Sequence, residues 1–414
     1  MTLKNFFKTN FTVSLLIILS LIIIINNFSR FFRNNNAHEF DPWFSNYQGG
    51  FVRRGLPGEF FFQIHEIFNI HPGWMIFIFV CILYFSFYLT FFYLVKKIKL
   101  DRFFIFAIFS PIAFYFPVLN SKATGHKEII FLCFFSIFCF FLPKIKKLHA
   151  NYLIILITLF AGLSHEGLIF YSTYLIIPFL LIFNFKNFKE ILFNLIPLLS
   201  VVLMLLFLIY YFQGTDQHVA DICDSVKNYV HSKCKNTGQI SLIASNLETY
   251  LAFPNWAGRY EGTYGLPLFP KYYIIYGIGF VFGFLPLAIL YGRSKLIKAP
   301  MNLLKVHPLV ILFFPLLITA PIYYVAFDWG RFLYISYMCS LIIIIFCLRN
   351  NIFYIRQKDS IIKDNMFVKF LFIISIIIYG FGWTVPICCE LNFKSGISKV
   401  IERVVYYYNY NIDH

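Results

Sequence analysis

Long apolar blocks separated by short polar segments dominate this chain. Blocks such as residues 73 to 95 and 191 to 212 exceed the roughly 20 residues that a helix needs to cross a bilayer. Inside lipid every backbone polar group must be bonded within the protein, so these blocks predict helices. Charged residues make up only 13% of the chain, whereas soluble domains contain about a quarter. The sequence therefore predicts an all-α polytopic integral membrane protein.

The apolar blocks predict about 11 transmembrane helices in a single transmembrane domain that covers residues 1–414. No small-x-small cleavage site follows the first block, which is expected to be a retained anchor. The expected helices cover about 11–28, 73–95, 103–119, 129–143, 151–163, 168–185, 191–212, 272–292, 308–327, a tenth that ends near 348, and 370–387. The main polar segments between them are 29–71 and 213–270. In the first of these, apolar residues at helical spacing over 59–69 predict a helix in the membrane interface.

Positive charge gathers in alternate loops and predicts the orientation. The loops with Lys4, Lys96, Lys144, Lys186, Arg293 and Arg349 hold 20 of the 35 Lys and Arg residues but only four acids. By the positive-inside rule these loops and the N-terminus are cytoplasmic, and the C-terminus lies on the other side with 29–71 and 213–270. The formal net charge of +16 is thus a signal of topology, and nucleic acid is not an expected partner.

The polar residues best suited to chemistry fall on the outer side, near helix ends. Arg53 and Arg54 lie among glycines, which allow close backbone approach, and a guanidinium can hold phosphate through two parallel bonds. The other clusters are Gly125 to Glu128, His165-Glu166, the segment 213–270 with Trp256, Arg259 and Tyr260, and Asp328 to Arg331. Ionisable groups at membrane depth are costly and usually line a polar cavity, so their convergence on one face predicts a shared site.

Each cluster also fits an ordinary feature of a membrane protein surface. The alternatives are a head-group contact for Arg53 and Arg54, a local pair of Lys127 and Glu128, a wetted turn at His165-Glu166, a solvated loop with interfacial aromatics at 213–270, and an i, i+3 ion pair of Asp328 and Arg331. Cys223 and Cys234 lie in 213–270, where an oxidising compartment would allow a disulfide, although the sequence leaves that pairing open. No His/Cys spacing indicates zinc, and no ligand set indicates another metal or a cofactor.

Four short motifs resemble a known family. GGFVRRGL after the first span, a Lys-Glu turn, a His-Glu turn and DWGR at a later helix start resemble Wzy-type polymerases of bacterial O-antigen and capsule. An acid in the early outer loop is similar to the GT-C class of glycosyltransferases, in which such an acid is the base. Glu39 and Asp41 are the matching positions here, although the usual paired-Asp pattern is absent. The resemblance implies a GT-C-like helical bundle with large periplasmic loops in the bacterial inner membrane.

The implied reaction joins two undecaprenyl-pyrophosphate-linked oligosaccharides at the periplasmic face. The sugar hydroxyl of one attacks the anomeric carbon of the other, and lipid pyrophosphate leaves. Cations would stabilise that leaving group without a metal or cofactor. The residues expected to bind pyrophosphate are Arg53, Arg54, Lys127 and Arg331. The expected general base is His165, which Glu166 orients or replaces, and the alternatives are Asp328, Glu39 and Asp41. The residues expected to stack on sugars are Trp256, Arg259 and Tyr260.

Two other functions stay open at this point. A GT-C glycosyltransferase that adds a side group from a polyprenyl-phosphate sugar would need one lipid opening, whereas a polymerase needs two. A lipid-linked sugar flippase would need polar residues in mid-membrane and on both faces, which the one-sided distribution of acids disfavours. Membrane lipid and a polysaccharide chain-length regulator are the further partners expected of a polymerase.

Overall fold

The computed structural model of this chain is built almost entirely from helices, as a helical membrane protein requires. The structure describes residues 9–33, 40–96, 98, 102–229, 234, 240–244, 271–297, 307–326, 328–355, 366–387, 395–396 and 398. Within these ranges five helices are long and apolar enough to cross a membrane: α4 (Pro72–Val95), α8 (Lys147–Ser164), α10 (Phe188–Tyr211), α14 (Lys271–Arg293) and α16 (Trp329–Arg349). At 1.5 Å per residue α4 is about 36 Å long, which exceeds the roughly 30 Å hydrocarbon core of a bilayer.

The other helical elements lie at the remaining expected helix positions or next to helix ends. In chain order they are α2 (Thr9–Phe28), η1 (Ser29–Arg33), η2 (Asp41–Phe44), α3 (Leu56–Phe68), α5 (Arg102–Ile108), α6 (Tyr115–Leu119), η3 (Ser121–Gly125), α7 (Glu128–Phe141), η4 (Leu142–Lys144), η5 (Glu166–Tyr171), α9 (Ser172–Ile182), α11 (Asp216–Ser225), η6 (Ser241–Ala244), α15 (Pro308–Val325) and α17 (Met366–Phe381). Two short strands, β1 (Ser294–Leu296) and β2 (Phe353–Ile355), pair antiparallel, with Ser294 opposite Ile355. The small sheet is an addition to the all-α fold that the sequence predicts.

The third expected span, 103–119, is not one continuous helix. It forms α5 and α6, separated by a turn at Ser110-Pro111. Proline disfavours helical backbone at the residue before it, and the Ser110 hydroxyl donates to the carbonyl of Gly283 in α14 at 3.1 Å. The break is therefore fixed both by local sterics and by a contact with another helix.

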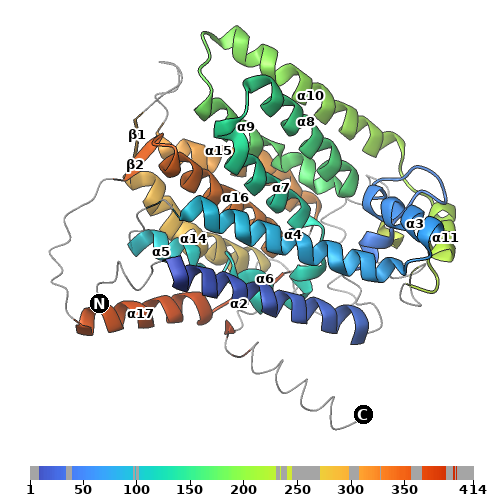
Figure 1. Ribbon diagram of the computed structural model, residues 1–414, viewed down its shortest axis with the longest axis horizontal. Helices are drawn as coiled ribbons and strands as arrows, with labels where there is room; N and C mark the ends of the chain where they lie inside the picture. The colour runs from blue at the N-terminus through green and yellow to red at the C-terminus, as the bar shows by residue number, and fades with distance from the viewer. Residues whose placement is uncertain are drawn as a thin grey trace.

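Helix α16 is the core of the bundle, and α10 lies at its edge. In its most apolar stretch α16 is 94% buried, while the matching stretch of α10 is 11% buried. Figure 1 shows α16 among the other helices and α10 along the outside, next to α8. A helix that is apolar all round is buried by its neighbours or by lipid. The exposed apolar side chains of α10, such as Phe193 and Phe207, therefore fit contact with lipid.

The two ends of the bundle differ in content. The β1–β2 sheet lies at one end, and α3 and α11 lie at the opposite end (Figure 1). Strand β1 directly follows Arg293, and β2 lies shortly after Arg349, in the basic loops of the sequence. Helix α3, which the spacing over 59–69 predicts, begins at Leu56 and exposes Phe60 and Phe68. The loop-rich end that carries α3 is where the candidate site forms.

Candidate functional site

The loop before α3 makes a tight turn that places Arg54. Helix α3 packs directly on the backbone of Ser45, since a Cβ at Gly58 would lie 1.9 Å from the Ser45 carbonyl oxygen. Arg54 itself has a φ of +68°, in the left-handed region that residues with side chains seldom adopt. Such strained backbone persists where surrounding contacts fix it, and it is concentrated at functional sites. The glycine-rich stretch therefore positions one arginine through a specific backbone conformation.

Arg54 forms a bidentate pair with Glu166. Its Nε donates to Glu166 Oε2 at 2.6 Å, and its Nη2 donates to Glu166 Oε1. Arg53 Nη1 lies 3.8 Å from the same Oε1. Glu166 opens η5, immediately after α8, so the pair joins residues 112 positions apart. The sequence predicted both partners as site residues but not that they bind each other.

Lys127 approaches Arg54 from a third segment of the chain. Its Nζ donates to the Arg54 carbonyl at 2.8 Å and lies 5.8 Å from the centre of the Trp43 ring. Burial and the charge of Arg54 hold the pKa of Lys127 well below its usual range. Lys127 therefore does not form the local pair with Glu128 that its position in the sequence allowed. An anion placed beside Lys127 would raise this pKa and so favour the charged ammonium.

His165 lies beside this cluster in an orientation that sets its tautomer. Its Nδ1 accepts from the Gly167 backbone N–H at 3.1 Å, so the proton of the neutral ring is on Nε2. Burial, and next to it the positive charge of Arg54, lowers the pKa of His165 to about 3. At neutral pH His165 therefore offers a hydrogen-bond donor at Nε2. This arrangement does not suit the role of general base for which its residue type made it the first choice.

Arg331, at the start of α16, organises a second charged cluster. Its Nη2 is 2.9 Å from Glu128 Oε1 and 3.0 Å from Asp328 Oδ2, and its Nη1 donates to His126 Nδ1 at 2.6 Å. The i, i+3 pair with Asp328 that the sequence allows is therefore present as part of a larger group. Asp328 has 32% of its side chain exposed, against 8% for Glu128. Asp328 is the more accessible acid of the two.

The segment 125–128 connects the two clusters. The Gly125 carbonyl accepts from Trp43 Nε1 at 2.6 Å. Lys127 turns toward Arg54, while Glu128 binds Arg331. The sequence placed the whole stretch 125–128 in the expected site but gave a role only to Lys127. That the adjacent Lys127 and Glu128 contact different arginines is seen only in the structure.

The other predicted site residues are Asp41, which the structure describes, and four residues that it does not describe. Asp41 is buried at the start of η2, two residues before Trp43. Glu39, Trp256, Arg259 and Tyr260 lie outside the described residues. Within the described ranges no three or more His, Cys, Asp or Glu side chains gather in a group that could hold a metal ion.

No protein-family model, curated protein or solved structure matches this chain. The function must therefore be inferred from the geometry of the two clusters.

Proposed function

We propose that this protein is a glycosyltransferase of the bacterial inner membrane that polymerises undecaprenyl-pyrophosphate-linked oligosaccharides at the periplasmic face. The observation that carries the proposal is a buried group in which, among the described residues, Arg53 and Arg54 share the carboxylate of Glu166 and Lys127 donates to the Arg54 carbonyl. An excess of cationic groups in a poorly solvated place is suited to an anionic ligand, and a guanidinium and an ammonium both bind phosphate oxygens. The carboxylate holds the arginines in place until that ligand arrives.

The proposed orientation places this cluster outside the cytoplasm. It requires about 11 spans, with the N-terminus and the basic loops in the cytoplasm. The disulfide between Cys223 and Cys234 supports an outer location for the segment after α10, because disulfides persist in oxidising compartments such as the periplasm. The β1–β2 sheet, at the opposite end of the bundle, would then lie on the cytoplasmic side (Figure 1).

In the proposed reaction, a bond forms between an acceptor hydroxyl oxygen and the anomeric carbon of the donor sugar. The bond from that carbon to the pyrophosphate oxygen breaks, and the pyrophosphate leaves with its electron pair. Arg54 and Lys127 would stabilise the growing negative charge, each unit charge at about 4 Å contributing roughly 4 kcal/mol at an effective dielectric constant near 20. Preorganised donors of this kind often contribute more to the rate of an enzyme than any other single effect.

The proton of the acceptor hydroxyl needs a base, and Asp328 suits that role best among the described candidates. It is the most exposed carboxylate of the two clusters, and Arg331 fixes its orientation. His165, which presents Nε2–H, would donate a hydrogen bond to a substrate oxygen instead. Glu166 would orient Arg54 rather than accept the proton.

The test is the length distribution of surface polysaccharide on a gel, in cells that lack the gene and in cells complemented with wild type or Arg54→Ala. The proposal predicts that deletion leaves a single lipid-linked repeat unit and that only the wild type restores the ladder. An intact ladder whose rungs change in size or antigenicity would instead indicate the GT-C glycosyltransferase that adds a side group. A ladder unchanged in every strain would overturn both functions.

A further inference from the structure

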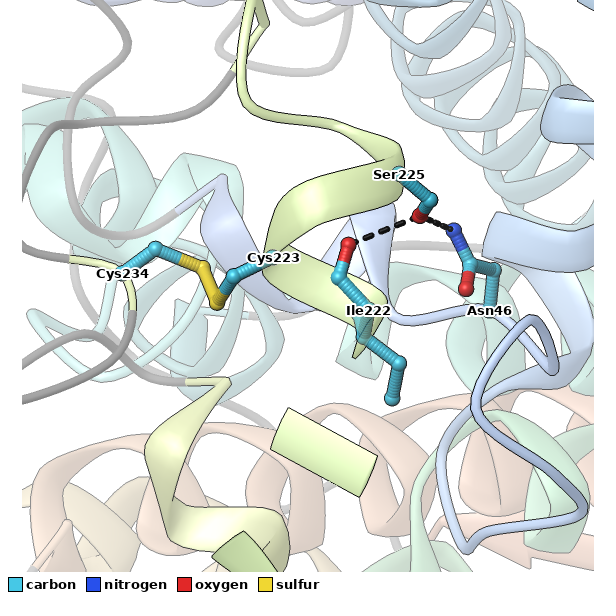
Figure 2. The surroundings of a disulfide bond; sticks show 5 residues. All are labelled: Asn46, Ile222, Cys223, Ser225 and Cys234. Atoms are coloured by element: carbon cyan, nitrogen blue, oxygen red, sulfur yellow. Dashed lines mark hydrogen bonds between the residues drawn. A yellow bond between two sulfur atoms is a disulfide. The ribbon is translucent and has the colours of Figure 1, made fainter. Parts of the chain in front are cut away.

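A disulfide links two positions of the segment after α10. Cys223, on α11, is bonded to Cys234, and their Cα atoms are 6.0 Å apart (Figure 2). Thr215 caps α11, since its Oγ1 accepts from the His218 N–H while its own N–H donates to His218 Nδ1 at 3.0 Å. The cap and the disulfide restrain the two ends of the same short helix. We call residues 214–229, 234 and 240–244 the latch.

The latch packs against the first outer loop. Asn46 Nδ2 donates to Ser225 Oγ at 2.9 Å, and Ser225 Oγ donates to the Ile222 carbonyl at 2.7 Å (Figure 2). At Gly49 a Cβ would lie 3.0 Å from the His218 carbonyl oxygen, so only glycine allows this approach of α11 without a shift. Two points of the first loop therefore rest on the helix that the disulfide restrains.

Arg53 joins the latch to the charged cluster. Its Nη2 donates to the carbonyls of Leu242 and Ile243 at 2.8 Å and 3.3 Å, while its Nη1 faces Glu166 Oε1 at 3.8 Å. The two carbonyls belong to η6, which Gly214 at the start of the latch approaches closely, since a Cβ there would lie 2.9 Å from the Ile243 carbonyl oxygen. Arg53 is buried. One guanidinium thus spans both outer segments.

We propose that the disulfide-closed latch positions Arg53, and that Arg53 in turn fixes the Glu166 carboxylate that holds Arg54. Arg53 and Arg54 are adjacent in sequence but have different roles: Arg54 faces the anionic substrate, and Arg53 is a positioning residue. Neutral backbone carbonyls take up two of the Arg53 hydrogen bonds. An arginine used this way sets geometry rather than binding the leaving group.

Hydrogen exchange on the purified full-length protein in detergent tests the latch without any assumption about activity. In the variant Cys223→Ser/Cys234→Ser, amides of residues 49–55 should exchange about tenfold faster, because the loop that the disulfide closes opens more often. Peptides from the start of α8 should be unchanged, and Cys81→Ser, which removes a free cysteine of α4, is the matched control. If the double variant does not accumulate, Arg53→Gln should raise exchange at 49–55 with the disulfide intact. Unchanged exchange in these variants would overturn the proposal.

An activity measurement tests the positioning role, and this arm rests on the proposed polymerase function. Arg53→Ala and the double cysteine variant should each shorten the ladder, and the combined variant should be no worse than Arg53→Ala, because both remove the same restraint. Arg53→Lys should keep part of the activity, since an ammonium can donate to a carbonyl, whereas Arg54→Lys should not. Losses that multiply, or equal loss in the two lysine variants, would contradict the positioning role. If the gene has no effect on the ladder, the polymerase function fails while the exchange result still decides on the latch.

Discussion

Helix α8 carries a charged pair at each end, and the two pairs differ in almost every physical respect. At its start, Lys147 binds Glu190 of α10, and both side chains are about 30% exposed, at 31% and 28%. At its end, Glu166 binds Arg54, with exposures of 19% and 10%, and Arg53 and Lys127 lie close by. The first pair joins one positive and one negative side chain at a partly exposed surface. In the second, three basic side chains gather near the Glu166 carboxylate beneath two loops. The same apolar helix therefore has an ordinary surface ion pair at one end and a candidate site at the other.

Of the substitutions that test this comparison, those at Arg54 should have the largest effect. Arg54→Ala should lower polymerisation at least about a hundredfold, the usual cost of losing a preorganised donor at a developing negative charge. Arg54→Lys should restore little, because an ammonium cannot make the bidentate contact. The readout is the polysaccharide ladder, with the amount of protein in the membrane fraction as control. A full ladder with Arg54→Ala would place the site elsewhere.

The next largest effect is expected at Arg331. Arg331→Gln leaves the buried Glu128 without its cation, and a broken buried pair costs roughly 3–5 kcal/mol of stability. The double variant Arg331→Gln/Glu128→Gln should be more stable than the single one, because the buried carboxylate is also removed and only the more exposed Asp328 is left without Arg331. Unfolding of the purified protein in mixed detergent micelles measures both. If the effects of the two substitutions on the free energy of unfolding simply added in the double variant, the cluster would not be a coupled unit.

For His165 we expect a smaller effect, on how the free energy of unfolding depends on pH. Unfolded His165 titrates near its ordinary pKa of about 6.5, while burial lowers the folded pKa to about 3. Between these values the unfolded state binds the extra proton, so the free energy of unfolding falls as pH falls. The contribution of this residue is about 1.4 kcal/mol per pH unit.

The matched variant is His165→Gln, which lacks this titration. Its free energy of unfolding should decline less than that of the wild type between pH 6.5 and pH 4. Identical acid limbs in the two proteins would mean that His165 titrates normally. For activity, His165→Ala should abolish turnover through loss of the Nε2–H donor, and the wild-type rate should show no inflection from His165 near pH 6.5.

The smallest effect is expected at the start of α8. Lys147→Ala removes a partly exposed pair, and such pairs add little because solvent screens them and ordering long side chains costs entropy. The ladder and the unfolding midpoint should both match the wild type. A loss of activity comparable to that of Arg54→Ala would remove the distinction between the two ends of α8.

The sequence predicts the helical class and the longest apolar helices, because hydrophobic length determines them; five of the described helices are long and apolar enough to cross a membrane. The span expected at 73–95 is α4 at Pro72–Val95, and the turn expected at His165-Glu166 separates α8 from α9. The break at Ser110-Pro111 was missed, since it depends on a bond to Gly283 that lies 173 positions away. Apolar pattern alone does not show such contacts.

The candidate site was predicted in its parts but not in its connections. The sequence indicated Arg54, Glu166 and Lys127, yet adjacency along the chain proved a poor guide to pairing. Arg53 and Arg54 both face Glu166, but Arg54 forms the bidentate pair while Arg53 donates to the carbonyls of η6. Lys127 and Glu128 contact different arginines. The pairing of Cys223 with Cys234, which the sequence left open, is present in the structure. The helix ends bring the residues together, and only the tertiary fold decides which side chains meet.

The most direct test of the proposed function is chain growth in a defined system. Purified full-length protein in proteoliposomes would receive the lipid-linked repeat unit extracted from the deletion strain, and the products would be separated by length. We expect chains of two or more repeat units with the wild type and with Lys147→Ala, and none with Arg54→Lys. Growth with Arg54→Lys equal to that of the wild type, or no growth with any form of the protein, would contradict the proposed function.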